Sequence, residues 1–106
     1  MVKIHGNWCG PNWTDGKVQS AREHLLAGGK FNTACVDKLD CACRKHDKGC
    51  SRKEGCSYKD DNKLIEKCDK ILANPLNFFT NPIMYAKARL VRDTFEVVRF
   101  TRYDAP

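Results

Sequence analysis

The sequence predicts a single, mainly α-helical domain that is held together by disulfide bonds. Three stretches repeat apolar residues at steps of three and four, which is the spacing that lines one face of a helix. Seven cysteines in 106 residues are typical of a disulfide framework in an oxidising compartment. This length fits one modest core, and no linker or internal repeat interrupts it, so we expect residues 1–106 to form one domain.

The front of the chain is expected to be mostly loop. Residues 5–16, HGNWCGPNWTDG, crowd Gly and Pro around two tryptophans and a cysteine, and both residue types oppose a regular helix or a central strand. A short helix is expected to follow, with Ser20 as its cap and Gly28 and Gly29 as its end.

Two helices with apolar faces are predicted in the middle of the chain. The first covers residues 36–50, with Asp37 as a possible cap, and the second covers residues 60–73 and ends before Pro75. Residues 49–58, GCSRKEGCSY, separate them as a turn rich in Gly, Ser and charge. The two apolar faces consist of Val36, Leu39, Cys43, His46 and Cys50 in the first helix, and Leu64, Ile65, Cys68, Ile71 and Leu72 in the second.

The C-terminal part is expected to contain an apolar loop and a third helix. Residues 76–82, LNFFTNP, are read as the loop, and Pro82 then starts a helix over 82–99. Met84, Ala88, Val91 and Phe95 lie on its apolar side. Residues 95–103, FEVVRFTRY, are alternatively read as a short terminal strand.

The charge of the chain favours anionic partners. Lys and Arg total 19 against 13 Asp and Glu, which gives a net charge of +6. Such a balance suits nucleic acid or an anionic lipid surface, and composition alone does not choose between them. No apolar run of about 18 residues is present, so no transmembrane segment is expected.

The densest chemistry lies in residues 39–50, LDCACRKHDKGC, which contain an adjacent His46–Asp47 pair. Neighbouring side chains on a helix point about 100° apart, so the two can serve different parts of one cavity. A neutral imidazole can act as a general base, and a carboxylate beside it can hold a hard cation. A cation in that position polarises an ester carbonyl while the base takes a proton from water.

These motifs resemble the calcium-dependent secreted phospholipase A2 superfamily. In that family a loop of the type W/Y-C-G-x-G precedes C-C-x-x-H-D and a helix that carries an Asp; here the loop is WCGPN and the helix is CACRKHD. Residues 35–50 are particularly similar to the plant and bee-venom-like branches. HDKGC and DDNKL also resemble the compact domains of some viral capsid proteins. The resemblance implies a small disulfide-stapled fold with a calcium loop at 5–16, two core helices carrying the site, and a third C-terminal helix.

The resemblance also implies a role for each site residue. His46 would activate water against the sn-2 ester of a glycerophospholipid, and Asp61 would orient it through the other ring nitrogen. The backbone N–H of Gly10 would help to hold the oxyanion. The implied calcium ligands are the Asp47 carboxylate and the carbonyl oxygens of Trp8, Gly10 and Asn12.

Asp61 competes with Asp60 and Asp69 for the orienting role. Asp61 shares the apolar face of the second helix, whereas Asp60 lies about 100° around it. Asp69 follows Cys68 as in larger secreted members and remains an alternative. A helix-capping role is the other interpretation of Asp60 or Asp61.

The chain departs from the family pattern in its loop and its cysteines. Asn12 replaces the second loop glycine, but Asn also tolerates left-handed backbone. Ala42 splits the paired cysteines, so the bridges must rearrange. The resemblance then implies three bridges with Cys35 left over, namely Cys9–Cys43, Cys41–Cys68 and Cys50–Cys56.

The implied partner is a phospholipid membrane surface, most favourably an anionic one, and not nucleic acid. The protein is expected to be a secreted monomer or, alternatively, a domain of a viral capsid protein. An apolar rim around the site would meet lipid, and its alternative role is to seal the core. Candidates for this rim are Trp8, Trp13, Phe31, Leu76, Phe78, Phe79 and Ile83.

Two rival functions are kept. In the first, zinc bound by Cys41, Cys43, His46 and Cys50 would support a basic nucleic-acid-binding domain, although this spacing is poor for common structural zinc sites. The second is a catalytically inactive member of the same fold that acts as a binding or toxin-like module.

Overall fold

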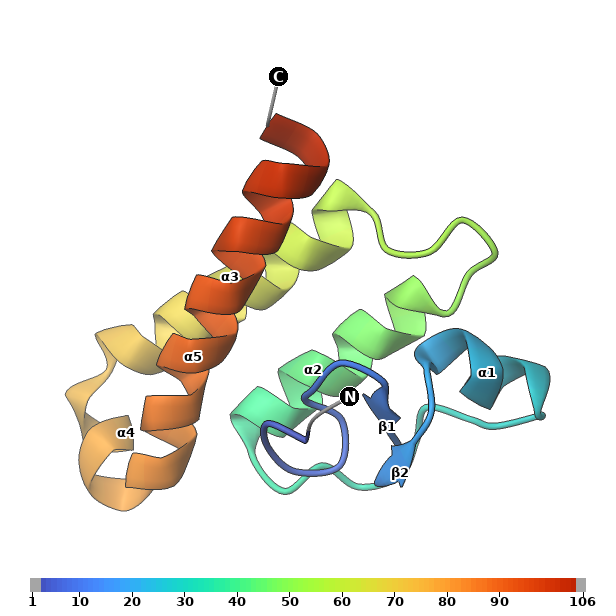
Figure 1. Cartoon of the computed structure of the whole chain (residues 1–106). Coiled ribbons are helices and arrows are strands. Elements are labelled where there is room, and N and C mark those ends of the chain that lie inside the picture. Colours follow the sequence, from blue (N-terminus) through green and yellow to red (C-terminus); the bar gives the residue numbers. More distant parts are fainter. Residues whose placement is uncertain (1–2, 105–106) are drawn as a thin grey trace.

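The computed structural model describes residues 3–104 and is mainly helical, with three disulfide bonds (Figure 1). Two strands of two residues each, β1 and β2, form an antiparallel hairpin in which Trp13 pairs with Val18. The helical elements are α1 (Ala21–Leu26), α2 (Lys38–Cys50), α3 (Tyr58–Ala73), α4 (Pro75–Thr80), α5 (Pro82–Arg99) and a final π-helical turn, η1 (Phe100–Asp104); the strands are β1 (Trp13–Thr14) and β2 (Lys17–Val18).

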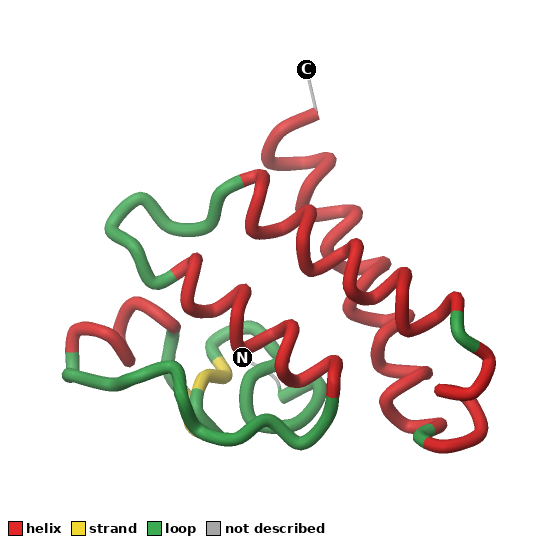
Figure 2. The backbone as a smooth tube through the Cα atoms, turned by 180° about the vertical axis from the view of Figure 1, so that it is seen from behind, coloured by secondary structure: helices red, strands yellow, loops and turns green. Residues whose placement is uncertain are grey.

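The elements form two groups with α2 between them. Helices α3 and α5 lie side by side in both views, and α4 joins them at one end (Figures 1 and 2). The hairpin, α1 and the loop segments around them lie on the other side of α2. Helix α2 therefore has one flank toward the N-terminal loops and one toward α3.

The helices begin at side chains that cap their first turns. Ser20 and Asp37 cap α1 and α2, as the sequence predicts. Ser57 caps α3 in a capping box with Asp60, so α3 starts at Tyr58, two residues before its expected start. The cap at Asp37 likewise moves the start of α2 from the expected residue 36 to Lys38.

Two expectations for the C-terminal part are wrong. Residues 76–82 are not a loop: the Asn74 side chain accepts a hydrogen bond from the N–H of Leu76, and Pro75 takes the first helical position, so that α4 forms. The alternative of a terminal strand also fails, because α5 continues to Arg99 and then into η1.

The hairpin inside the front loop was not predicted. Asp15 and Gly16 both have positive φ, 56° and 69°, as a two-residue type I′ turn requires. An Asp-Gly pair is the usual sequence signal for this turn, but strands of two residues leave no alternation to read.

The core lies where α2, α3 and α5 meet the N-terminal segment. Each helix contributes apolar side chains at positions three or four residues apart, and the Trp8 side chain belongs to the same cluster. The buried apolar cluster consists of Trp8, Cys9, Leu39, Ala42, Cys43, Leu64, Cys68, Ile71, Met84, Ala88 and Val91.

Two of the three expected disulfides are present and the third is different. Cys9–Cys43 and Cys50–Cys56 form as expected. Cys41 pairs with Cys35, which lies in the turn just before α2, and not with Cys68. Cys68 is a free thiol, fully buried in the core, so Cys68 and not Cys35 is the unpaired cysteine.

No helix among residues 3–104 has the length and apolar character needed to cross a membrane.

Candidate functional site

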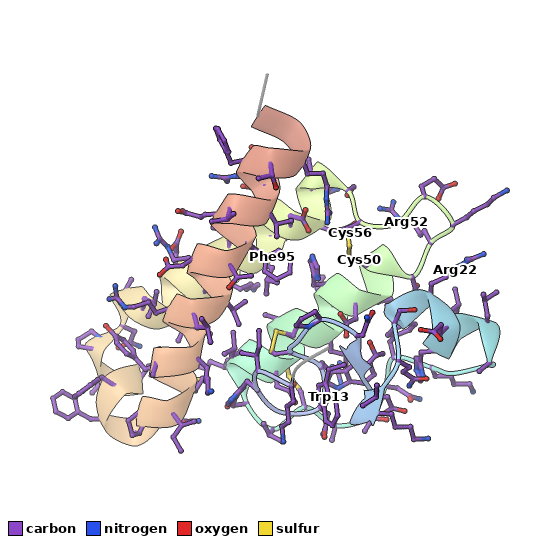
Figure 3. All side chains as sticks on the ribbon, in the orientation of Figure 1. Trp13, Arg22, Cys50, Arg52, Cys56 and Phe95 are labelled. Carbon is purple, nitrogen blue, oxygen red and sulfur yellow. A yellow bond between two sulfur atoms is a disulfide. The ribbon has the colours of Figure 1, made fainter. Side chains whose placement is uncertain are left out.

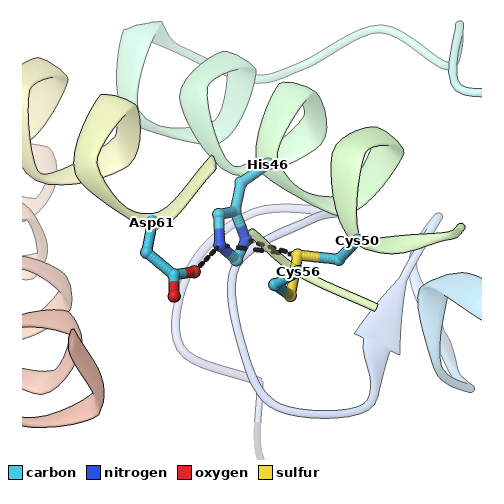
Figure 4. Close-up of side chains that lie close together, drawn as sticks. All are labelled: His46, Cys50, Cys56 and Asp61. Carbon is cyan, nitrogen blue, oxygen red and sulfur yellow. Dashed lines mark hydrogen bonds and ion pairs between the residues drawn. A yellow bond between two sulfur atoms is a disulfide. The ribbon is translucent and has the colours of Figure 1, made fainter. Parts of the chain in front are cut away.

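His46 and Asp61 form a buried pair between α2 and α3. The Nε2 atom of His46 lies 2.7 Å from Oδ1 of Asp61, and the Asp61 side chain is fully buried (Figure 4). A carboxylate accepts a hydrogen bond from a protonated ring nitrogen, so this pairing assigns the proton of a neutral imidazole to Nε2 and leaves Nδ1 as an acceptor. Asp61, the expected partner of His46, is therefore the residue that lies against it in the structure.

The Cys50–Cys56 disulfide and Phe95 pack around the same imidazole. The Cys50 sulfur lies 3.6 Å from Nδ1 and 3.5 Å from Nε2 of His46, on the side away from Asp61 (Figure 4). These near-equal distances place the sulfur in line with neither nitrogen. The Phe95 ring meets the imidazole edge to face, with centroids 4.7 Å apart. Figure 3 shows the disulfide between the end of α2 and the segment that leads to α3.

Arg102 pairs with the other oxygen of Asp61. Its Nη1 atom donates to Oδ2 of Asp61 at 2.9 Å, so one buried carboxylate receives hydrogen bonds from His46 and from a cation on η1. A buried charge needs such a partner, because removing it from water unpaired is costly. Sequence reasoning missed Arg102, since nothing in residues 95–103 signals a contact with α3.

The front loop and α2 together line a cleft of about 370 Å³ that includes His46 and Asp47. Gly10 and Asn12 line it too, and both have positive φ, 142° and 53°. Asn12 thus adopts the left-handed backbone that was expected of it in place of the family's glycine. The carbonyl oxygens of Gly10 and Asn12 each accept one backbone hydrogen bond, which leaves each oxygen a second lone pair.

Asp47 faces the front loop and has no cationic partner among the described residues. The Thr14 hydroxyl donates to its Oδ2 at 3.2 Å. Burial raises the pKa of the Asp47 carboxyl to about 8, with the hydrogen bond from Thr14 opposing this and the charge of Asp40 adding to it. An unpaired, largely buried carboxylate next to backbone carbonyl oxygens is a donor set that fits a hard cation such as Ca²⁺.

Asp40 holds the front loop against α2. Its fully buried carboxylate accepts hydrogen bonds from the backbone N–H groups of Asn7, Trp8 and Val36 at 2.9–3.2 Å. These hydrogen bonds require the backbone of Gly6 to lie against the Asp40 carboxylate, and a Cβ at Gly6 would lie 2.3 Å from the Asp40 Cγ. The sequence signal was a charged residue beside Leu39 on the buried side of a predicted helix, and sequence reasoning did not use it.

The two competing carboxylates of α3 have other roles. Asp60 accepts hydrogen bonds from Ser57 in the capping box and pairs with Arg52, which confirms the capping interpretation for that residue. Asp69 is exposed and pairs with Arg92 on α5. Neither is bonded to His46 among the described contacts, so Asp61 alone fits the orienting position.

The cysteines of the zinc alternative are all disulfide-bonded, which leaves that alternative without thiolates. Cys41, Cys43 and Cys50 each belong to a different bridge. Potential ligand atoms of His46, Cys50, Cys56 and Asp61 do lie within 4.8 Å of one another, but the two sulfurs are bonded together. Zinc binds cysteine as the thiolate, so the oxidised protein does not offer this set.

The expected apolar rim is divided between the core and a distant face. The Trp8 side chain is buried in the core, which excludes a rim role for it, and Phe31 packs partly buried against that core. The exposed side chains of Leu76, Phe78, Phe79 and Ile83 come from α4 and the start of α5 and are not among the described residues that line the cleft. Apolar and charged groups of α5 and η1 line it instead, namely Val91, Phe95, Val98 and Arg102.

No protein-family model, curated protein or solved structure matches this chain.

Proposed function

We propose that this protein is a calcium-dependent phospholipase A2, which hydrolyses the sn-2 ester of glycerophospholipids to a lysophospholipid and a free fatty acid. One observation carries the proposal: His46, paired with Asp61 of α3 at 2.7 Å, and Asp47, whose carboxylate has no cationic partner among the described residues and accepts a hydrogen bond from Thr14, are adjacent on α2. Base and cation ligand are thus next to each other, as ester hydrolysis by this route requires.

His46 acts as the general base in this proposal. With Nε2–H bonded to Asp61, the free lone pair on Nδ1 takes a proton from a water molecule. The water oxygen attacks the ester carbonyl carbon, and the bond to the glycerol oxygen then breaks. His46 returns the proton to that oxygen, so the products are one alcohol and one acid. Asp61 keeps the imidazole in the required tautomer and stabilises its charged form.

Asp47 and the carbonyl oxygens of Trp8, Gly10 and Asn12 would hold the calcium ion. When bound, calcium polarises the ester carbonyl and stabilises negative charge on its oxygen. Asp40 supports this ligand set, because it fixes the backbone of Asn7 and Trp8 at the entrance of the loop. The backbone N–H of Gly10 is proposed as a further donor to the same oxygen.

The proposed setting is the secretory route, since three disulfides form and persist where the surroundings are oxidising. The proposed substrate surface is a phospholipid bilayer, favoured when it is anionic by the net charge of +6. We propose a monomer that acts on this surface through the cleft mouth.

Product analysis tests the proposed function. The purified, oxidised protein is mixed with phosphatidylglycerol vesicles whose sn-1 and sn-2 acyl chains differ in length, with calcium or with a chelator, and the products are identified by mass spectrometry. The proposal predicts release of the sn-2 chain alone and only with calcium. Release of the sn-1 chain would overturn the positional assignment, and absence of any release would favour the inactive binding module.

A further inference from the structure

A second and larger hollow, a groove of about 1250 Å³, lies between α2 and α3. Seven of its eighteen lining residues are lysines or arginines. Its lining includes one aromatic residue, Phe31, and two acidic ones, Asp60 and Glu66. The cations that line it are Lys38, Arg44, Lys45, Lys48, Lys63, Lys67 and Lys70.

The lysines come from one face of each helix. On α2, Lys38 and Lys45 are seven residues apart, and Lys48 follows three residues later. On α3, Lys63, Lys67 and Lys70 follow one another at steps of four and three. Residues at such steps share a helix face, so the groove has a row of ammonium groups along each wall. At 1.5 Å per residue, the row on α2 extends for roughly 15 Å.

These positive charges are not neutralised within the described part of the chain. None of the six lysines forms an ion pair there, and all six are exposed. The two acidic groups are engaged elsewhere: Asp60 pairs with Arg52, and Glu66 accepts a hydrogen bond from Asn62. Like charges crowded in one groove repel each other, and an anionic ligand would remove that repulsion.

We infer that this groove, which adjoins the proposed catalytic cleft and shares His46 and Leu64 with it, binds a linear, sulfated polysaccharide. A groove with charges along both walls fits a chain lying inside it, whereas a flat bilayer contacts only the rim. Single-stranded nucleic acid is usually held by several stacked aromatic side chains, and the lining of this groove offers one Phe, Phe31, beside the His46 imidazole. Lysines act as separate point charges and need no planar, bidentate acceptor, which suits sulfates spaced along a chain. Disulfide-bonded proteins also meet such polysaccharides outside the cell.

A charge-matched comparison tests this inference. The groove variant replaces Lys45, Lys63 and Lys67 by Gln, and the control replaces Lys17, Lys53 and Arg89, which do not line the groove, by Gln. Binding of a heparin hexasaccharide to each oxidised protein is measured by calorimetry at several salt concentrations. We expect the groove variant to bind about tenfold or more weakly than wild type and with a shallower salt dependence, and the control to bind nearly as wild type.

Two outcomes would overturn the inference. If the control loses as much affinity as the groove variant, the hexasaccharide binds through the net charge of the protein and not through the groove. If anionic vesicles or a single-stranded RNA bind more tightly than the hexasaccharide, and the groove variant loses that binding, the groove serves a different class of partner. Circular dichroism of both variants separates these results from unfolding. Polysaccharide binding is measured without any substrate, so its result does not depend on whether the protein hydrolyses phospholipid.

Discussion

His46 and Asp61 connect α2 to α3 through the hydrogen bond of 2.7 Å between Nε2 and Oδ1, and no disulfide joins these two helices directly. If Asp61 orients a catalytic base, Asp61→Asn should lower the turnover number by a factor on the order of 10² to 10⁴, because an amide no longer enforces the required tautomer. The initial rate of fatty-acid release measures this.

Asp69→Asn is the matched control for that variant. It removes an exposed carboxylate from the same helix and touches only the pair with Arg92. The control should turn over substrate as the wild type does. An Asp61→Asn protein that is folded by circular dichroism and hydrolyses phospholipid at the wild-type rate would show that the pair is purely structural.

Asp47→Asn should weaken calcium binding by about tenfold or more, because the only charged ligand proposed for the ion becomes neutral. Calorimetric titration with calcium measures the dissociation constant without any need for substrate. Asp15→Asn is the comparison: it removes a carboxylate from the front loop that Asp47 faces, and Asn tolerates the positive φ of 56° at that turn. Equal losses in the two variants would argue against a ligand role for Asp47.

Gly6→Ala should destabilise the fold through Asp40. The added methyl would lie 2.5 Å from each Asp40 carboxylate oxygen, in addition to the strain of a positive φ of 60°. We expect the free energy of unfolding to fall by about 3 kcal/mol. Gly28→Ala carries similar backbone strain at φ 83° but meets nothing within 4 Å, so it should cost only about 1 kcal/mol. Denaturant unfolding compares them, and equal losses would remove the argument for close packing at Asp40.

The thiol of Cys68 should be inert in the folded protein. Burial raises its pKa to about 12, with the charge of Asp69 adding to this and Arg92 opposing it, so the reactive thiolate stays scarce at neutral pH. A thiol reagent should modify no cysteine in the native protein and one cysteine in denaturant. In the folded state the thiol keeps its proton to a higher pH than in the unfolded state, where its pKa is the ordinary 9.0. The contribution of Cys68 to the free energy of unfolding therefore falls as pH rises from about 9 toward 12. Mapping the reactive thiol to Cys35 would contradict the bridge pattern.

Much of the fold could be predicted because the helices are long enough to show their period. The apolar steps in α2, α3 and α5 indicated the buried faces, and the same steps placed Asp61 toward the core beside Leu64. Helix α4 could not be found in this way, because its six residues span less than two helical turns, which is too short to show a period. Its signal was the Asn74–Pro75 start alone.

The site was predictable where one helix face carries it and not where loops meet helices. His46 and Asp61 each share the apolar face of their own helix, which is a local property of the sequence. The role of Asp40 depends on the backbone groups that the front loop brings to it, and that of Arg102 on where η1 lies beside α3. Residue spacing does not encode either. The Cys35–Cys41 bridge was missed for the same reason, since connectivity follows from the packing of the turn before α2.

The roles proposed for His46 and calcium are tested together by the initial rate of sn-2 fatty-acid release from anionic vesicles, measured side by side for wild type and His46→Gln. Wild type should turn over with calcium, stop when a chelator is added and recover when calcium is restored, while His46→Gln should stay inactive throughout. Turnover by wild type in the presence of the chelator, or by His46→Gln with calcium, would contradict these roles.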